Sequence, residues 1–251
     1  MIRLQMWDAD VWLGGRLVLD GLDMVLNAGE AIAVCGPNGA GKSSAIRAAA
    51  GLLPLTRGVV QLGDDDIAGL SERTRAERIA YLPQERRIAW NMPAIEVAAL
   101  GAPFLSAADS LARAQAALEE VGAGALASRG VAEMSGGERA RVLLARVLVS
   151  EAPTLLADEP IAGLDPDAQL LLLDGLKART RLGQTVLVSL HDLTLAAQWA
   201  DRILVLHQGR EVAFGSPLDA LSSDVLQRVF GVRGGWIGGP NGPLLDAVRV
   251  Q

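Results

Sequence analysis

The feature that most constrains this chain is a glycine-rich loop near its N-terminus. An apolar run from Glu30 to Cys35 leads into Gly36-Pro37-Asn38-Gly39-Ala40-Gly41-Lys42-Ser43, and a helical pattern follows from Lys42 to Ala50. This loop matches the pattern G-x-x-x-x-G-K-[ST], and a strand before it with a helix after it is the context that the pattern requires. The sequence therefore predicts a phosphate-binding loop.

Each residue type in this loop has a use in binding phosphate. Glycines allow backbone N–H groups to curl around phosphate oxygens, and the N-terminus of the helix adds partial positive charge. Lys42 is expected to reach the terminal phosphates and the Ser43 hydroxyl to hold magnesium. The chain has only two lysines, Lys42 and Lys177, among 23 basic residues. A compact ammonium fits this loop, whereas a planar guanidinium would collide with it.

Short apolar runs alternate with helical patterns over most of the chain, which predicts a mostly parallel sheet with helices on its faces. The expected strands span 30–35, 59–62, 79–82, 154–157, 185–190 and 202–207, and the expected core helices span 42–50, 167–180 and 192–199. The stretch from about 86 to 150 instead reads as helices over 94–101, 107–121 and 135–149, hence as an insertion. The glycine-rich segment from Gly231 to Pro243 is expected to be a surface tail.

Composition and charge exclude several classes of protein. With 50% hydrophobic and 21% charged residues, the chain is not disordered. Its longest uncharged stretches, 97–108 and 234–245, have 12 residues each, whereas a spanning helix needs about 20 apolar residues. The net charge of −6 disfavours nucleic-acid binding. The N-terminus lacks the plan of a signal peptide, so we expect a cytosolic chain whose apolar excess is covered by another protein.

Further motifs lie beyond this loop. Ser135-Gly136-Gly137-Glu138 opens a helix, so its backbone N–H groups and the Ser135 hydroxyl form a second anion site. The apolar strand 154–157 ends in Asp158 and Glu159. Side chains of adjacent strand residues point in opposite directions, so one carboxylate can bind a metal while the other contacts a water molecule. Gly163-Leu164-Asp165 and His191 follow.

In this order, the motifs resemble those of the ATP-binding subunit of an ABC transporter, over about residues 2 to 230. The resemblance identifies Gln84 as the Gln-loop, 134–138 as the signature and Asp158 as the end of Walker B. It identifies 162–165 as the D-loop and His191 as the switch histidine. The sequence departs only mildly from the family pattern. Met134 stands where the family usually has Leu, Ile161 stands where Thr or Ser is common, and Ser44-Ala45 stands where Thr-Leu is common.

The resemblance implies an α/β fold with a P-loop NTPase (RecA-like) core and a mostly parallel sheet. It adds an N-terminal antiparallel β part and an inserted α-helical subdomain. The expected organisation is a single ATPase domain over 1–230, with its core at about 1–85 and 151–230 and its helical subdomain at about 86–150, followed by a tail over 231–251.

The resemblance also implies a role for each site residue, with ATP and magnesium as ligands. Glu159 is the general base, Lys42 contacts the β- and γ-phosphates, and His191 holds the γ-phosphate. Magnesium and its waters are held by Ser43, Gln84 and Asp158. The nucleotide is also contacted by Gly36, Pro37, Asn38, Gly39, Ala40, Gly41, Ser44 and Asp165.

The resemblance further implies that two subunits pack head to tail. Ser135, Gly136, Gly137 and Glu138 of one subunit then face the γ-phosphate held by the phosphate loop of the other. An aromatic residue near the N-terminus is implied to stack on adenine. Trp12 fits best, with Trp7 as the rival and a core position for Trp12 as the alternative.

Three other features have plainer interpretations. His207 lies between two strand-like runs and is expected to belong to a hairpin turn. Asp64-Asp65-Asp66 resembles a metal cluster, but its glycine-flanked position after a strand indicates a solvated loop. Cys35, the only cysteine, is expected to be a packed strand residue.

The resemblance is to import systems in particular, because 93–103 and 191–202 are similar to segments in importers of ferric siderophores, haem and cobalamin. It implies a homodimer that drives an integral membrane permease, fed by a periplasmic or lipid-anchored binding protein, at the cytoplasmic face of the cell (inner) membrane. The segment 86–90, with its Arg and Trp residues, is the expected docking face.

Other functions stay open. Importers of zinc, manganese or branched-chain amino acids are near rivals. An ABC ATPase acting on DNA or ribosomes would need long coiled coils or a second ATPase half, whereas this chain has one phosphate loop and about 92 residues between Lys42 and Ser135. A small-molecule kinase has no use for the Ser-Gly-Gly-Glu motif.

Overall fold

The computed structural model describes residues 2–84 and 91–249 of the chain. A six-stranded sheet, in the order β10-β9-β3-β8-β7-β6, forms the centre of the molecule. Its strands are β3 (Ala31–Cys35), β6 (Ile79–Leu82), β7 (Thr154–Ala157), β8 (Thr185–Ser189), β9 (Arg202–His207) and β10 (Arg210–Gly215). All neighbouring strands are parallel except β9 and β10. The expected α/β class with a mostly parallel sheet is confirmed.

A second, antiparallel sheet packs beside the first, as the resemblance implies. Its order is β2-β1-β4-β5, with β1 (Ile2–Leu13), β2 (Arg16–Asn27), β4 (Arg57–Leu62) and β5 (Asp65–Asp66). The long strands β1 and β2 are joined by Gly14 and Gly15, whose φ angles of 55° and 78° suit a two-residue hairpin turn.

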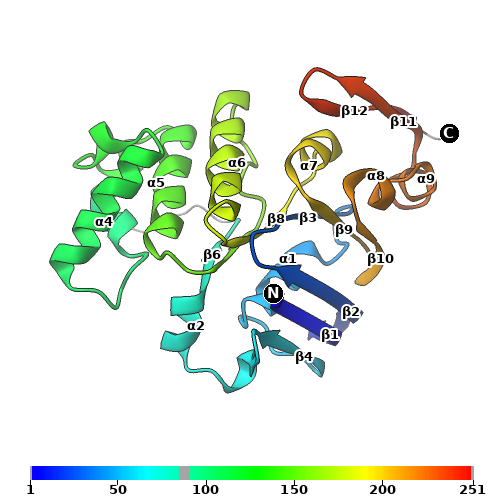
Figure 1. Ribbon diagram of the computed structural model, residues 1–251, viewed down its shortest axis with the longest axis horizontal. Coiled ribbons are helices and arrows are strands. Elements are labelled where there is room, and N and C mark those ends of the chain that lie inside the picture. Colours follow the sequence, from blue (N-terminus) through cyan, green and yellow to red (C-terminus); the bar gives the residue numbers. More distant parts are fainter. Residues whose placement is uncertain (1, 85–90, 250–251) are drawn as a thin grey trace.

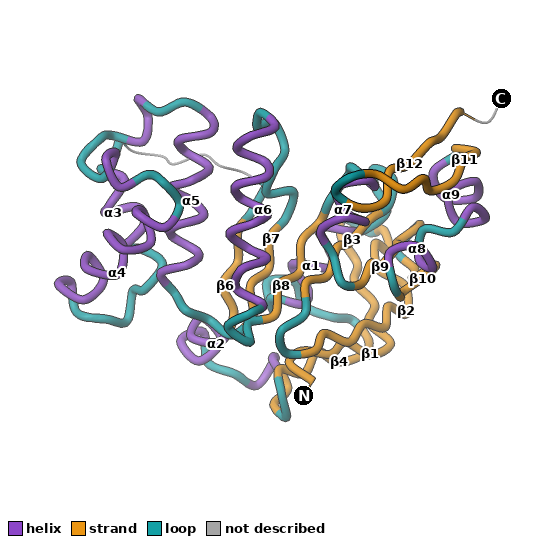
Figure 2. The backbone as a smooth tube through the Cα atoms, turned by 45° about the horizontal axis from the view of Figure 1, so that its top comes forward, coloured by secondary structure: helices purple, strands orange, loops and turns teal. Residues whose placement is uncertain are grey.

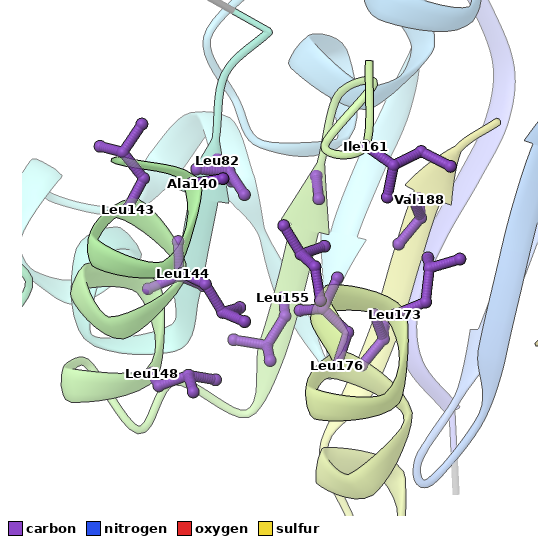
Figure 3. Close-up of a cluster of buried hydrophobic side chains, with 14 of the residues drawn as sticks. Leu82, Ala140, Leu143, Leu144, Leu148, Leu155, Ile161, Leu173, Leu176 and Val188 are labelled. Carbon is purple, nitrogen blue, oxygen red and sulfur yellow. The ribbon is translucent and has the colours of Figure 1, made fainter. Parts of the chain in front are cut away.

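The alternation of side chains along the central strands creates two cores. On β3, Ile32 and Val34 face the antiparallel sheet, while Ala33 and Cys35 face the opposite side. Helix α1 (Lys42–Ala49) packs between the two sheets. On the opposite side the sheet is covered by α6 (Pro166–Thr180) and α7 (Leu193–Trp199). Figure 3 shows Leu155 of β7 in this core between Leu144 of α5 (Gly136–Val149) and Leu176 of α6.

Three helices that lie between β6 and β7 in the sequence form a separate lobe beside the sheet (Figures 1 and 2). They are α3 (Ala94–Ala99), α4 (Ala107–Glu120) and α5 (Gly136–Val149), and each packs against the other two. After α3 the backbone passes so close to α5 that a Cβ on Gly101 would lie 1.8 Å from the carbonyl oxygen of Arg146. These helices agree with the ranges expected from the sequence to within two residues. Helix α2 (Glu72–Arg78), which the periodicity did not predict, precedes β6.

The C-terminal segment is an ordered hairpin, which corrects the expectation of a surface tail. After α8 (Pro217–Ala220) and α9 (Ser223–Phe230), strands β11 (Val232–Gly239) and β12 (Gly242–Arg249) pair in antiparallel fashion. The indole Nε1 of Trp236 donates to the carbonyl oxygen of Leu221 over 2.9 Å. Gln198 of α7 donates to the carbonyl oxygen of Pro243 over 3.1 Å. The glycine content suggested a surface tail, but these hydrogen bonds hold the hairpin against Leu221 and α7.

Among the residues that the structure describes, we find no helix with both the length and the apolar character needed to span a bilayer.

Candidate nucleotide site

The loop between β3 and α1 can form only with glycine at two of its positions. Gly36 and Gly41 have φ angles of 155° and 103°. A Cβ on Gly36 would lie 2.3 Å from the carbonyl oxygen of Leu206, and a Cβ on Gly41 would lie 2.8 Å from that of Val18. Larger residues would therefore push the loop away from β9 and β2. These backbone contacts hold the loop over the N-terminus of α1, where it can receive phosphate.

The turn between β9 and β10 supports this loop from behind. The backbone N–H of Gly209 donates to the carbonyl oxygen of Ala40 over 3.0 Å, and its own carbonyl oxygen accepts from Asp20 over 3.0 Å. His207 ends β9 and pairs with Arg210 across the turn. The hairpin assignment of His207 is confirmed. The support that this turn gives to the phosphate loop was not predicted, because a Gln-Gly pair between apolar runs predicts a turn but not its neighbour.

Lys42 is the buried cation of the site. Its Nζ donates to the carbonyl oxygens of Gly36 and Pro37 over 2.9 and 3.1 Å. Burial lowers the pKa of this ammonium, while the nearby charges of Glu159 and Asp158 act in the opposite direction. The ammonium thus lies inside the loop, where phosphate oxygens can replace the carbonyl groups as its acceptors.

Ser43 and Asp158 come together at the start of α1 and the end of β7. The Ser43 Oγ donates to Asp158 Oδ1 over 3.0 Å. Asp158 is 3% exposed, and the Ser189 Oγ donates to the same carboxylate oxygen over 2.8 Å. A hydroxyl and a carboxylate are hard oxygen ligands of the kind that magnesium prefers. The donor set therefore fits a magnesium ion.

Glu159 connects the ends of three parallel strands. Its Oε1 lies 2.5 Å from His191 Nε2, and its Oε2 accepts a hydrogen bond from Gln84 over 2.7 Å. Its backbone has a φ of 45°, a conformation that is uncommon for residues other than glycine and is found preferentially at functional sites. Gln84, Glu159 and His191 follow β6, β7 and β8, whose carboxyl ends meet at one edge of the sheet.

A pocket of about 240 Å³ opens between the phosphate loop and Glu159. Its lining consists of Val18, Asn38, Gly39, Ala40, Gly41, Lys42, Ser43, Ser44 and Glu159. Most of the loop residues predicted to bind nucleotide therefore surround one space. The residues of the signature are not among its lining.

The two candidate adenine-stacking residues both lie on β1. Trp12 is 53% exposed and pairs with Leu17, the neighbour of the pocket residue Val18. Trp7 is 44% exposed and pairs with Val59 of β4, farther along the strand. The exposure of Trp12 contradicts the alternative of a core residue. Its register places it nearer to the phosphate loop than Trp7.

Ser135 and Glu138 cap the N-terminus of α5 reciprocally. The backbone N–H of Glu138 donates to the Ser135 Oγ over 3.2 Å, and that of Ser135 donates to Glu138 Oε2 over 2.8 Å. The hydrogen bond from the Ser135 backbone is the main cause that lowers the pKa of Glu138. A Cβ on Gly137 would lie 3.9 Å from a carboxylate oxygen of Asp165, which caps α6. The signature and Asp165 are thus neighbours, while Ser135 and Gly136 are exposed.

Of the plainer interpretations, the packed position of Cys35 is confirmed, whereas Asp65 and Asp66 are exposed but form the short strand β5 and not a loop. Asp65 pairs with Arg78 over 2.7 Å, and Asp66 accepts a hydrogen bond from the backbone of Ala68. Within residues 2–84 and 91–249, no three His, Cys, Asp or Glu side chains form a group that could hold a metal ion. Cys35 is buried, and burial raises the pKa of its thiol to about 12. The expected docking residues 86–90 lie outside the described residues.

Comparisons with known proteins agree on one family. A profile of the ABC transporter family matches residues 19–162. The hemin import ATP-binding protein HmuV of Myxococcus xanthus is 41% identical, over 97% of this chain and 96% of its own length. The protein of the same name from Streptomyces coelicolor is 42% identical, over 88% of this chain and 80% of its own length.

Two solved structures add to this agreement. The ATP-binding subunit of an ABC transporter superposes with a TM-score of 0.78 at 29% identity, covering 93% of this chain and 95% of its own. An inward-facing metal-chelate type ABC transporter gives a TM-score of 0.84 over 100% of this chain and 98% of its own. At 21% identity, the latter likeness shows the fold alone.

Proposed function

This chain belongs to the ABC transporter family as an ATP-binding subunit, and on that premise we propose how it works and what it helps to import. It is the ATP hydrolase of an importer for haem or a related iron chelate. Two copies act together beneath a separate membrane permease.

The observation that most directly supports the proposal is the grouping of Lys42, Ser43 and Glu159 around one pocket, with the buried Asp158 bonded to Ser43. Three kinds of group needed for phosphoryl transfer meet there: a cation for the phosphates, hard oxygen donors for a metal, and a carboxylate for a water. Such a reaction depends on positioning and on charge stabilisation more than on covalent chemistry.

The residues of the chain divide this work. Lys42 exchanges its carbonyl acceptors for the β- and γ-phosphate oxygens of ATP. Glu159 accepts a proton from the attacking water, and His191 orients Glu159 and contacts the γ-phosphate. Ser43, Asp158 and, through water, Gln84 would hold magnesium, which supplies positive charge to the terminal phosphates when bound. Trp12 stacks on the adenine ring, a contact worth about 1–3 kcal/mol.

A second copy of the chain completes each site. The signature residues Ser135, Gly136 and Gly137 lie at the N-terminus of α5, and they are not in the pocket of their own chain. In a head-to-tail dimer they contact the γ-phosphate bound by the partner, with Asp165 beside them. Each dimer then encloses two ATP molecules.

The imported substrate is proposed from the relatives. Proteins named for hemin import align with this chain at 41% and 42% identity. We assign the chain to the cytoplasmic face of the cell (inner) membrane, bound there through its permease, with a periplasmic or lipid-anchored protein delivering the substrate. Import of another metal chelate, such as a ferric siderophore or cobalamin, is the alternative.

Uptake in whole cells tests this proposal. In cells that lack this chain, we expect uptake of iron-labelled hemin to fall and to return with the wild-type chain but not with the Glu159→Gln variant. Uptake of a labelled ferric siderophore and of cobalamin is measured in parallel. Loss of one of these with normal hemin uptake would overturn the haem assignment and leave the ATPase assignment intact.

A further inference from the structure

Ser189, the last residue of β8, contacts both carboxylate residues that follow β7. It is fully buried, with an exposed fraction of 0%. Its Oγ donates a hydrogen bond to Asp158 Oδ1 over 2.8 Å and accepts one from the backbone N–H of Glu159 over 2.7 Å. A single hydroxyl thus uses its donor and its acceptor on two consecutive residues of the site.

We propose that Ser189 is a positioning residue that orients the Asp158 carboxylate for magnesium and holds the backbone of Glu159. It does not line the pocket beside the phosphate loop, so it acts through these two residues and not on the nucleotide. The inference rests on the proposed assignment of Asp158 to magnesium.

The location of Ser189 makes it a fixed donor. Strand β8 lies in the middle of the six-stranded sheet, between β3 and β7. The other hydroxyl on Asp158 Oδ1 belongs to Ser43, on the helix whose N-terminus receives phosphate. Because the Ser43 hydroxyl is also proposed to bind magnesium, Ser43 cannot by itself define the orientation of the Asp158 carboxylate. Ser189, packed in a central strand, can do so whatever Ser43 binds.

Strand alternation explains why this residue reaches the site. Leu187 packs in the core that contains α1, and Ser189 lies two residues farther on, hence on the same face. The hydroxyl is therefore directed to the N-terminal end of α1, where Ser43 and Asp158 meet.

The backbone of Glu159 gives Ser189 its second role. With a φ of 45°, Glu159 occupies a sparsely populated region, and such conformations persist only where the surroundings enforce them. The hydrogen bond from its N–H to Ser189 is one such restraint. Through it, the same side chain sets the carboxylate proposed to hold magnesium and the backbone of the proposed general base.

Binding of a non-hydrolysable ATP analogue, adenylyl imidodiphosphate, tests this role without turnover. Its affinity is measured by calorimetry in EDTA and in magnesium, for the wild type and for Ser189→Ala. In EDTA we expect both proteins to bind the analogue with equal affinity. On adding magnesium, the gain in affinity should be roughly tenfold smaller for Ser189→Ala than for the wild type, because removing a partner that orients a metal ligand commonly lowers metal affinity by 10- to 100-fold. The same magnesium-dependent gain in both proteins would overturn the inference.

Matched variants separate positioning from general destabilisation. Ser189→Thr keeps the hydroxyl and should retain the magnesium-dependent gain. Thr185→Val removes the other buried hydroxyl of β8, which donates to the carbonyl oxygen of Asn27 over 2.7 Å at the opposite end of the strand. It should leave the gain unchanged, and an equal loss there would overturn the inference. Thermal melts establish that each variant is folded, and Ser189→Cys replaces the alanine variant if that one does not fold.

Asp158→Asn distinguishes the two ways in which the idea can fail. If this variant keeps the full magnesium-dependent gain, the proposed magnesium assignment is wrong. If it loses the gain while Ser189→Ala keeps it, only the role of Ser189 is wrong.

Discussion

Glu159 is the residue on which the proposed chemistry depends most. Its carboxylate contacts both Gln84 and His191, and its backbone is held in a left-handed conformation by Ser189. These contacts come from the ends of β6 and β8, so the side chain has a defined position before any substrate binds. A carboxylate held in this way needs little rearrangement to accept a proton from water.

Glu159→Gln should abolish hydrolysis and leave ATP binding intact. The amide has nearly the same shape but cannot accept the proton of the attacking water. We expect at least a hundredfold lower kcat, consistent with the typical contribution of a general base, and an ATP-bound dimer in size-exclusion chromatography. Hydrolysis at the wild-type rate would show that another residue is the base.

Cys35 should be almost unreactive while the chain is folded. Burial raises its thiol pKa from 9.0 to about 12, and only the thiolate is nucleophilic. At pH 8 the thiolate fraction is then about a thousandfold lower than in the unfolded chain. Labelling with a chromogenic disulfide at pH 8, with and without urea, measures this difference. Labelling at the unfolded rate without urea would contradict the burial of Cys35.

The same shift in pKa has a consequence for stability. Because the thiol pKa is higher in the folded chain than in the unfolded chain, the contribution of the neutral thiol is fully present below the unfolded value. It decreases as the pH rises from 9.0 towards about 12. The free energy of unfolding should therefore fall in this alkaline range.

At the scale of elements, the phosphate loop depends on parts of the chain that are far away in sequence. The β9–β10 turn donates a hydrogen bond to Ala40, and the carbonyl oxygens of Leu206 and Val18 lie against Gly36 and Gly41. The loop is thus held between a strand of each sheet. The conformation of the phosphate loop therefore depends on both sheets.

The C-terminal hairpin should contribute measurably to stability through Trp236. The indole is half-buried against the core and donates to the carbonyl oxygen of Leu221. Trp236→Ala should lower the free energy of unfolding by about 2 kcal/mol, below the 3–5 kcal/mol typical of fully buried tryptophan. Urea denaturation measures the loss.

The neighbouring residue Ile237 is the matched control for Trp236. It is 53% exposed, and exposed substitutions usually change stability by less than about 0.5 kcal/mol. Ile237→Ala should therefore be nearly neutral. Equal stability of both alanine variants and the wild type would mean that the hairpin does not pack on the core.

At the scale of the whole molecule, the phosphate loop and the signature lie in different parts of one chain. The phosphate loop lies at the junction of the two sheets, whereas the signature begins α5 in the helical lobe and borders Asp165. The pocket lined by the phosphate loop includes no residue of the signature. Head-to-tail pairing would complete both sites at once by the same symmetry operation.

Mixing two defective variants tests this pairing. In a Glu159→Gln background, Lys42→Ala lacks the phosphate cation and Ser135→Arg blocks the signature, so neither should dimerise with ATP by itself. A heterodimer of the two has one site with both defects and one intact site. We therefore expect the mixture to form dimers that contain a single ATP. No dimer in the mixture would contradict a site shared between subunits.

Much of the molecule could be predicted from its sequence. The strand over 154–157 and the helices that begin near Lys42 and Ser135 follow from hydrophobic periodicity and capping residues, which are local properties. The phosphate loop and the Asp158-Glu159 pair are contiguous motifs, so they are also visible without a structure. The family, and with it the fold class, follows from their order.

Other features depended on the tertiary structure. Nothing near Ser189 in sequence indicates that its hydroxyl contacts Asp158, and nothing near Gly209 indicates that it supports Ala40. Glycine-rich composition suggested a tail where Trp236 anchors a hairpin. Local pattern determines which segments become strands and helices, because side-chain periodicity acts over a few residues. Which of them become neighbours is decided by the packing of the whole chain, since those contacts join residues far apart in sequence.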